Sequence, residues 1–313
     1  MTTARDIKYR NQAALARRDE IWRHNPHPGF DITALSAMPP YVGLVDAPLF
    51  PDLTFVMLLS NNDDGVALRW LWNGCYEPMS LGLWALLAHR SDVIFDIGAH
   101  TGVYTLAAAA ANPGAKVISC EPYDLNYARL LVNLRANGFT TDTAYSIAIS
   151  DRDADVPFTV STNAWYLSTG GSVGARADAI ARHVPAMRLD TICQRNRVKI
   201  SLIKIDTEGH ELAVVRGAQE VLRESGPDIL MESVFNEATG ELECLLQSNG
   251  YSYYLVDDDK LELRPVNTLA PVASAGAPAM GQLNRFVTRR NSREVQELAE
   301  TAREKLQIIY SRS

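Results

Sequence analysis

The sequence predicts an α/β protein built on a mainly parallel sheet with helices on both faces. From about residue 91 onward, short segments rich in β-branched residues alternate with segments of helical periodicity. Strands that alternate with helices along the chain form βαβ units, whose strands lie parallel in one sheet. The chain has 313 residues, of which 47% are apolar, enough for one large domain with an extension.

The first 90 residues are expected to form an N-terminal extension. Residues 1–30 predict a short helix and then an irregular arm with the sequence HNPHPGF. Two β-rich runs, Thr54–Ser60 and Val66–Trp72, flank the turn sequence NNDDG, and this pattern predicts a β-hairpin. A helix is predicted over Glu77–Ala88, with Pro78 in the first turn, where proline is tolerated.

Residues 91–290 are expected to form the main domain, and residues 291–313 a C-terminal helix. The predicted strands are Val93–Ile97, Lys116–Cys120, Ala144–Ile149, Leu202–Ile205, Asp228–Met231, Tyr251–Val256 and Arg285–Thr288. The predicted helices are Gly102–Ala111, Leu125–Asn137, a segment ending at Leu222, and Glu241–Asn249. The tail is amphipathic over Ser292–Tyr310. We expect it to pack on its own domain, with a homodimer contact as the alternative.

Composition and charge exclude several classes of protein. Thirty Lys and Arg against 37 Asp and Glu give a formal net charge of −7, which argues against a nucleic-acid partner. No apolar run approaches the roughly 18 residues that cross a bilayer, so we expect no membrane contact. The N-terminus is polar, unlike a signal peptide, and the four scattered cysteines form no C-x-x-C pair. These features favour a cytoplasmic protein.

A glycine-rich turn, DIGAHTG at residues 96–102, links the first strand of the main domain to an alanine-rich helix. Gly98 lets the chain turn sharply, and Gly102 lets a ligand approach the start of the helix. The spacing differs from the G-x-G-x-x-G of dinucleotide sites, and Asp96 would repel a diphosphate there. The turn therefore favours a ligand with a cationic amino group and hydroxyls. Glu121 ends the next strand, where an acidic side chain binds both ribose hydroxyls.

Together with a second segment, this turn resembles the class I S-adenosylmethionine (SAM) methyltransferases, and within them the FkbM family. The second segment reads LIKIDTEGHE at 202–211 and VVRGA at 214–218, similar to the family signature KIDVEGHE…VLKGA. Three shorter pieces agree: Tyr76-Glu77-Pro78, Ala148-Ile149-Ser150-Asp151 and Leu189-Asp190. The resemblance covers about residues 70–260. It implies a Rossmann-like fold with a seven-stranded sheet.

The resemblance also implies an activity and a set of SAM-binding residues. The methyl group of SAM would pass to a small molecule, usually to a hydroxyl of a sugar, polyketide or peptide natural product, leaving S-adenosylhomocysteine (SAH). N-methylation, or a SAM-fold partner protein without catalysis, is the alternative. Carried over by position, the SAM-binding residues are Glu77, Asp96, Gly98, Ala99, His100, Thr101, Gly102, Glu121, Pro122, Ile149 and Ser150. The family more often has Asn at the position of His100, and imidazole still offers one hydrogen bond.

Four polar residues at predicted strand ends are candidates for the chemistry: Asp206, Glu208, His210 and Glu232. His210 is the expected general base, because an unperturbed imidazole has a pKa of about 6.5. Asp206 and Glu208 are expected to position the acceptor. The structural alternatives are that His210 caps the next helix or bonds Glu211, and that the two carboxylates only shape a helix start. The four residues together could hold a divalent cation, although a metal requirement is not favoured.

The segment Ser161–Arg176, rich in hydroxyls, glycine and aromatic residues, is expected to be a lid or acceptor loop. Trp165 and Tyr166 would then stack on a ring of the acceptor. Within this segment, GGSVG at 170–174 formally matches the G-x-S-x-G of α/β-hydrolases. No apolar strand leads into it, and a hydrolase would leave the glycine-rich turn unexplained. A NAD-dependent oxidoreductase is disfavoured because the third glycine of its fingerprint is missing.

Overall fold

The computed structural model describes residues 4–161, 167, 172–173, 179–233, 239–274, 277–278 and 280–310. Trp165, Tyr166 and the glycines of the GGSVG segment lie outside these residues, as does most of the lid expected over Ser161–Arg176. Every helix in the described part of the chain is too short or too polar to cross a membrane.

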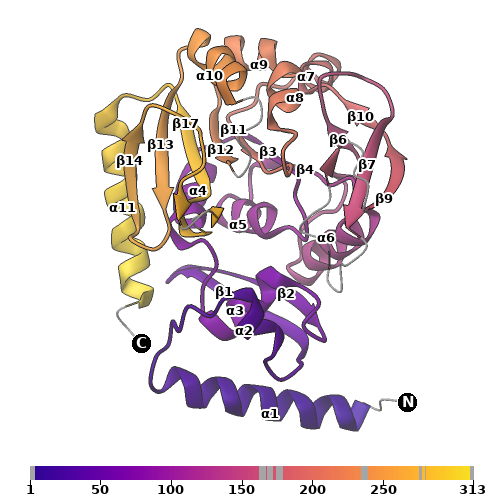
Figure 1. Ribbon diagram of the computed structural model, residues 1–313, viewed down its shortest axis with the longest axis vertical. Coiled ribbons are helices and arrows are strands. Elements are labelled where there is room, and N and C mark those ends of the chain that lie inside the picture. The colour runs from indigo at the N-terminus through magenta and orange to yellow at the C-terminus, as the bar shows by residue number, and fades with distance from the viewer. Residues whose placement is uncertain are drawn as a thin grey trace.

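The centre of the molecule is a sheet of eight strands within the described residues (Figure 1). The strands are β3 (Val93–Ile97), β4 (Lys116–Cys120), β5 (Ala144–Tyr145), β11 (Leu202–Ile205), β12 (Asp228–Glu232), β13 (Ser252–Asp257), β14 (Glu262–Val266) and β17 (Asn284–Thr288). Their order across the sheet is β14-β13-β17-β12-β11-β3-β4-β5. The run from β12 to β5 is parallel, whereas β17 is antiparallel to both of its neighbours.

This sheet confirms the predicted α/β architecture and adds detail at its edges. All seven predicted strands are present, and β14 pairs with β13 as an eighth. The strand predicted over Ala144–Ile149 divides, because β5 joins the sheet while β6 (Ala148–Ile149) pairs with β10 (Ala186–Met187). From β3 the chain runs outward to β4 and β5, and it later returns to β11 on the other side of β3. Such a reversal of strand order creates the crevice where α/β proteins bind ligands.

Helices cover both faces of the sheet (Figure 1). One face packs against α4 (Pro78–Ala88), α5 (Val103–Ala111), α6 (Asp124–Ala136) and α11 (Ser292–Tyr310). The other packs against α7 (Leu189–Asn196), α8 (Glu211–Arg216), α9 (Gln219–Glu224) and α10 (Thr239–Ser248). Ile94 of β3 joins the first core and its neighbour Phe95 joins the second. Because both faces are buried, the strands read as continuous apolar runs.

The prediction of a second hairpin strand over Val66–Trp72 is wrong. In the structure, β2 (Leu53–Ser60) pairs with the preceding β1 (Val42–Phe50), while the predicted strand Val66–Trp72 lies in the helix α3 (Gly65–Asn73). The NNDDG sequence therefore starts a helix instead of closing a hairpin.

Asp64 explains why this segment is helical. Its side chain accepts hydrogen bonds from the backbone N–H groups of Val66 and Ala67, which makes it an N-cap. The helix ends at Gly74, which takes the left-handed conformation. Eight of the nine residues of α3 are buried. A short apolar run buried on all sides does not reveal by its periodicity whether it is helix or strand.

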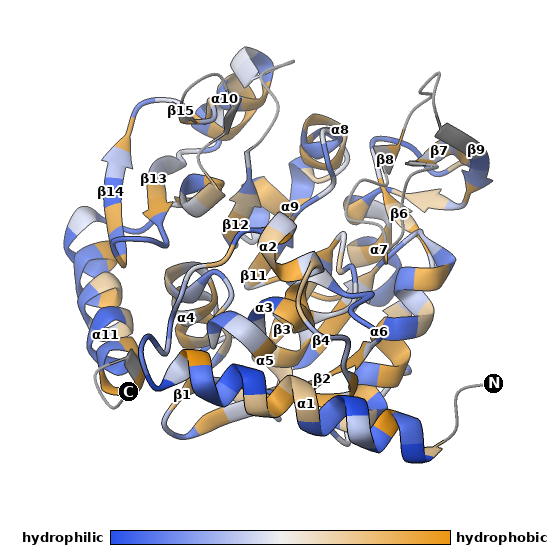
Figure 2. Ribbon diagram, turned by 60° about the horizontal axis from the view of Figure 1, so that its bottom comes forward, coloured by the Kyte–Doolittle hydropathy of each residue, from blue (hydrophilic) through white to orange (hydrophobic). Residues whose placement is uncertain are grey.

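The hairpin of the N-terminal segment packs on the helices α4, α5, α6 and α11, which cover one face of the main sheet. Helix α1 (Ala4–Trp22), most of whose residues are hydrophilic, lies across the hairpin (Figures 1 and 2). Asn11 bonds both backbone groups of Val42, with distances of 2.7 and 3.0 Å. On the other side, Asn133 of α6 accepts the N–H of Leu58 at 2.8 Å and donates to the carbonyl of Thr101 at 2.8 Å. One side chain thus joins the hairpin to the glycine-rich turn.

The predicted C-terminal helix is confirmed as α11. Its apolar stripe, which includes Val295, Leu298, Ala302 and Leu306, is buried in the core beside α4 and β14. The stripe therefore packs on its own chain, as expected.

The remaining elements lie around the sheet. A small antiparallel sheet has the order β8 (Ser172–Val173), β7 (Val156–Ser161) and β9 (Ala179–Val184). The short helix α2 (Ile32–Ser36) precedes the hairpin. The pair β15 (Ala273–Ser274) and β16 (Ala277–Pro278) and the 3₁₀ turn Met280–Gln282 precede β17.

We expect Asn133→Ala to lower the free energy of unfolding by roughly 2–4 kcal/mol. The change leaves the N–H of Leu58 and the carbonyl of Thr101 without a partner, at about 1–3 kcal/mol for each group that stays buried. Urea denaturation of both proteins would measure the difference. The control Asn196→Ala removes an exposed side chain that bonds the carbonyl of Ile192, and it should change stability by less than about 0.5 kcal/mol. Equal losses in the two variants would contradict the bridging role.

Candidate active site

A cavity of about 640 Å³ opens at the carboxyl ends of β3, β4, β11 and β12. This is the edge where open α/β sheets bind ligands, and the volume is typical of a small-molecule site. Of the predicted cofactor residues, those that line the cavity are Glu77, Asp96, Gly98, Ala99, His100, Glu121, Pro122 and Ile149. Thr101, Gly102 and Ser150 are buried next to this wall without being part of it.

Gly98 lies where the ends of β3 and β11 nearly touch. Its φ is +79°, and a Cβ atom built on it would lie 1.7 Å from the backbone oxygen of Asp206. A side chain cannot fit there without moving backbone. The N–H of Gly98 donates to the carbonyl of Cys120 at 2.9 Å, so the turn is also held against β4. The glycine-rich turn is therefore fixed on both sides by neighbouring strands.

Asp96 is buried at the end of β3. It accepts a hydrogen bond of 2.6 Å from the hydroxyl of Thr105, on the helix that follows the turn. Burial raises the pKa of Asp96 to about 6, and the Thr105 hydrogen bond acts in the opposite direction. The side chain ties the strand to the helix on either side of the turn while it lines the cavity.

Glu121 reaches back from the end of β4 to the glycine-rich turn. One carboxylate oxygen accepts the N–H of His100 at 2.8 Å and the other accepts the N–H of Tyr123 at 2.7 Å. Burial raises the pKa of Glu121 to about 8, although the two backbone hydrogen bonds oppose the rise. Glu121 thus stands at the position predicted for a ribose-binding acid.

Three residues that line the cavity have a left-handed backbone without being glycine. The φ values are +39° at Glu77, +50° at His100 and +54° at Glu208. Such conformations cost on the order of 1–3 kcal/mol each, and they cluster at functional sites. Asn and His tolerate this region better than most residues. The presence of His100 where the family more often has Asn is therefore compatible with the local backbone.

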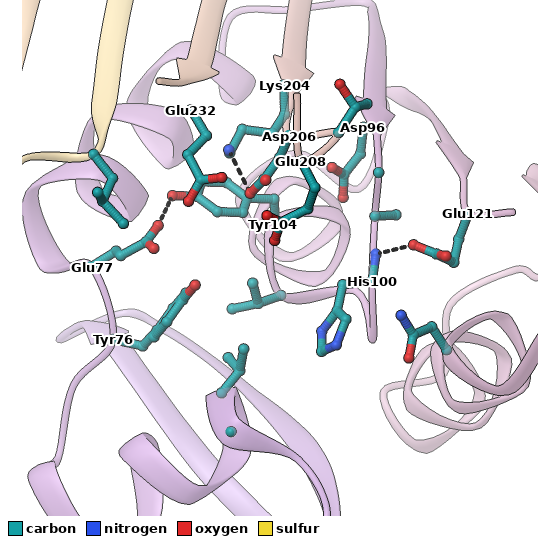
Figure 3. A pocket seen from close by; sticks show the side chains of 18 of the residues that line it. Tyr76, Glu77, Asp96, His100, Tyr104, Glu121, Lys204, Asp206, Glu208 and Glu232 are labelled. Carbon is teal, nitrogen blue, oxygen red and sulfur yellow. Dashed lines mark hydrogen bonds and ion pairs between the residues drawn. The ribbon is translucent and has the colours of Figure 1, made fainter. Parts of the chain in front are cut away.

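Glu77 is held at the end of the cavity opposite Glu121 (Figure 3). Its carboxylate accepts the phenol O–H of Tyr104 at 2.5 Å and the side-chain N–H of Asn284 at 3.1 Å. Tyr104 itself lies in the first turn of α5, directly after the glycine-rich turn. The Tyr76 ring lies beside Glu77, with its hydroxyl directed toward the same cluster (Figure 3).

Lys204 and Asp206 form an ion pair at the centre of this cluster. Lys204 is almost completely buried in β11, and its Nζ lies 3.0 Å from Asp206 and 4.7 Å from the centre of the Tyr104 ring. Burial acts to lower the pKa of Lys204, but the carboxylates of Asp206, Glu77 and Glu232 outweigh it, so the net pKa is raised. Burial likewise acts to raise the pKa of Asp206, and the Lys204 ammonium overcomes it. Asp206 is therefore ionised at neutral pH.

Glu208 and Glu232 complete a group of three carboxylates with Asp206. One oxygen from each lies within 4.8 Å of the others. Burial and the neighbouring Asp206 raise the pKa of Glu232 well above its usual value, which favours its neutral form. Carboxylate oxygens are ligands that Mg²⁺ accepts. The trio could therefore hold a cation, but Lys204 already neutralises Asp206.

His210, the expected base, is not part of this trio. Its Nε2 lies 3.0 Å from the hydroxyl oxygen of Ser150, beside the predicted adenine loop. Burial lowers the pKa of His210 to about 4, so the imidazole is neutral near pH 7. It occupies the N-cap position of α8 without a capping side-chain hydrogen bond.

Sequence reasoning missed Tyr104 and Lys204. The signal for Lys204 was present, because lysine is almost never fully buried unless it is paired. Its place inside the apolar strand LIKI therefore indicates a buried carboxylate partner. Tyr104 carried no comparable signal, since an aromatic residue at the start of an apolar helix usually belongs to the core.

Comparison with known proteins identifies the family. The model of the methyltransferase FkbM domain matches residues 96–253, about half of the chain. The 31-O-demethyl-FK506 methyltransferase FkbM of Streptomyces tacrolimicus is 25% identical over 217 residues, which cover 59% of this chain and 82% of that protein. The hexuronic acid methyltransferase AglP of Haloferax volcanii is 28% identical over 140 residues, 44% of this chain and 54% of that protein.

A solved structure, the methyltransferase FkbM of Methylobacillus flagellatus KT, aligns with 72% of this chain and 55% of its own length, at 16% identity and a TM-score of 0.41. The family match includes the glycine-rich turn, Glu121 and the 202–218 segment, whose side chains meet in one cavity. The chain therefore belongs to the FkbM family of SAM-dependent methyltransferases.

Proposed function

We propose that this protein transfers the methyl group of SAM to a hydroxyl oxygen of a small molecule. The observation that carries the proposal is the ionised Asp206 beside the glycine-rich turn, with 29% of its side chain still exposed. A group that takes up the proton of a hydroxyl must be both ionised and accessible. The names of two relatives, a 31-O-demethyl-FK506 methyltransferase and a hexuronic acid methyltransferase, point to oxygen-rich acceptors.

SAM would lie across the carboxyl ends of β3 and β4. Glu121 would accept the ribose hydroxyls, and Ile149 and Ser150 would flank the adenine. The methionine part would rest on the glycine-rich turn. There, the Nε2 atom of His100 is buried and makes no hydrogen bond to any described residue, so a methionine carboxylate would give it a partner. The cationic sulfonium would then face the cluster around Glu77 and Asp206.

Methyl transfer is an in-line displacement, so the enzyme must align acceptor, methyl and sulfur and remove the acceptor's proton. We assign proton removal to Asp206 and give Glu208 and Glu232 the placement of the acceptor. One observation argues for this over His210: the imidazole contacts Ser150 at the adenine end. His210 would then support cofactor binding.

We expect Asp206→Asn to lower kcat by about 10²–10⁴-fold, because general-base catalysis contributes this much. His210→Ala should keep kcat within about tenfold at saturating SAM and should weaken SAM binding instead. Methyl transfer would be measured with an acceptor found by screening sugars, uronic acids and polyketides. Amine acceptors belong in the same screen, since the same placement would serve N-methylation.

The same comparison of variants also tests whether His210 is the general base. If His210→Ala loses as much kcat as Asp206→Asn at saturating SAM, the imidazole is the base and Asp206 positions the acceptor. If both variants keep full turnover, neither residue removes the proton. Assays with EDTA and with added Mg²⁺ test whether the three carboxylates hold a cation, because a chelator would then abolish turnover.

Binding of SAH should weaken as the pH falls below about 8. Burial raises the pKa of Glu121 to about 8 in the free protein, and the ribose hydroxyls are best accepted by the ionised carboxylate. Below that pH, binding must release a proton, so the affinity falls by up to about tenfold per pH unit. Calorimetric titration between about pH 6 and about pH 9, in buffers of different ionisation enthalpy, measures both the affinity and the released proton.

Glu121→Gln is the control for this titration. The variant should bind SAH more weakly, and the part of the pH dependence due to Glu121 should vanish. An identical slope in the two proteins would assign the titration to another group. NAD⁺ serves as the ligand control, because binding of NAD⁺ but not of SAM or SAH would overturn the methyltransferase proposal. Tight SAM binding without turnover of any acceptor would favour a non-catalytic partner protein.

A further inference from the structure

Arg69 stands out in the helix α3. The other eight residues of this helix are buried, and Arg69 alone keeps partial exposure. It lines the same cavity as the glycine-rich turn, but on the wall that the N-terminal segment contributes. A guanidinium on an otherwise buried helix is unfavourable unless something compensates its charge.

The contacts of Arg69 leave half of its guanidinium available. Nη1 donates to the carbonyl of Gly65 at 3.1 Å, and Cζ lies 5.9 Å from the centre of the Tyr76 ring. These two contacts fix the orientation of the group. Among the described residues, no carboxylate forms an ion pair with Arg69, and its Nε and Nη2 atoms make no hydrogen bond. Nε and Nη2 form the edge of a guanidinium that binds a carboxylate with two parallel hydrogen bonds.

The surroundings of Arg69 are apolar. Phe30, Ile32 and Val66 line the cavity on this side, and Met280 of the turn before β17 also lines it. Ile32 is 43% exposed and Met280 67% exposed, which is unusual for such side chains. Phe30 is held in place by Asn73, whose side chain bonds its N–H at 3.0 Å and its carbonyl at 2.9 Å. The wall around Arg69 is thus apolar, and hydrogen bonds hold Phe30 in place within it.

We propose that Arg69 binds an acidic group, a carboxylate or a phosphate monoester, on a methyl acceptor whose adjacent body is apolar. The inference rests on the proposed function and names the substrate class for that cavity. Asp206, Glu208 and Glu232 also line this cavity, at the ends of β11 and β12, and a cluster of acids does not attract an anion. The acidic group would therefore stay at Arg69 and direct the other end of the molecule, with its hydroxyl, toward Asp206.

Benzoate and phenyl phosphate are suitable probes, because each joins an anion to an apolar ring, and benzamide is the neutral counterpart of benzoate. The probes would be titrated at millimolar concentrations into ¹⁵N-labelled protein, with and without SAH. The Arg69 Nε–H signal, assigned by its loss in Arg69→Met, reports binding. We expect benzoate or phenyl phosphate to shift this signal and benzamide to leave it unchanged. Whichever anion binds more tightly tells carboxylate from phosphate recognition.

Variants test the same inference by affinity. Arg69→Met keeps the apolar stem and should weaken binding of the anion at least tenfold, whereas Arg69→Lys should retain part of it because the charge remains without the two-pronged edge. Arg23→Met, which removes an exposed arginine from the N-terminal segment, should change nothing. SAH affinity should stay the same in all three variants.

Failure of either anion to shift the Arg69 signal would overturn the inference, as would equal binding of benzamide. Both results are measured on the wild-type protein, and the Arg69→Met variant serves only to assign the signal. If the anions bind but SAH does not, the proposed function fails while the anion site stands. If SAH binds and the anions do not, only the anion site fails.

Discussion

The near contact between Gly98 and the backbone of Asp206 determines the geometry of the whole site. β3 and β11 are parallel neighbours, with Ile97 opposite Ile205, so both strands end at the same level. The chain leaves β3 into the glycine-rich turn and leaves β11 into Asp206. Because Gly98 lacks a Cβ, the two departures can touch, and a larger residue would meet the Asp206 oxygen at 1.7 Å. The glycine-rich turn and the start of the segment after β11 are therefore held together through backbone atoms.

Once the backbone is fixed, the difficulty is to bury so many carboxylates together. An isolated buried charge is very unfavourable, so each acid needs a donor or a proton. Asp96 has the Thr105 hydroxyl, Glu77 has Tyr104, and Asp258 accepts both the N–H and the hydroxyl of Ser80. Burial raises the pKa of Glu232 well above its usual value, which favours the neutral acid.

Asp206 differs from these acids in that its partner is a cation. Lys204 keeps it ionised, and the cavity still reaches it. An ionised acid beside a sulfonium attracts the charged cofactor and weakens its hold once the methyl group has left. In the proposed reaction, the same carboxylate therefore serves cofactor binding, proton removal and release of the neutral product.

How far the sequence predicts this structure depends on whether a feature is local. The strand ends, the glycine turn and Glu121 were predictable because strand periodicity and a required positive φ leave marks within a few residues. The strand β2 was predicted to pair with the wrong segment because Asp64 serves equally well in a turn or as an N-cap. The choice between the two depends on burial of α3 against distant strands. The pKa of His210 was unpredictable for a similar reason, since its burial arises from tertiary packing.

The cavity wall that carries Arg69 differs from the wall at the strand ends because the two walls come from different parts of the chain. The cofactor is the same for every member of such a family, so its half of the site is built from motifs near the central strands. The proposed acceptor half comes from segments outside the motifs, in particular Phe30, Ile32 and Arg69, which line the cavity. Phe30 packs against the same core as α3 and the hairpin. Arg69 lies on the wall from the N-terminal segment and the acids Asp206, Glu208 and Glu232 lie at the strand ends, so the two walls differ in polar character. A polar cavity selects the orientation of a molecule as well as its shape, and orientation is what an in-line displacement requires.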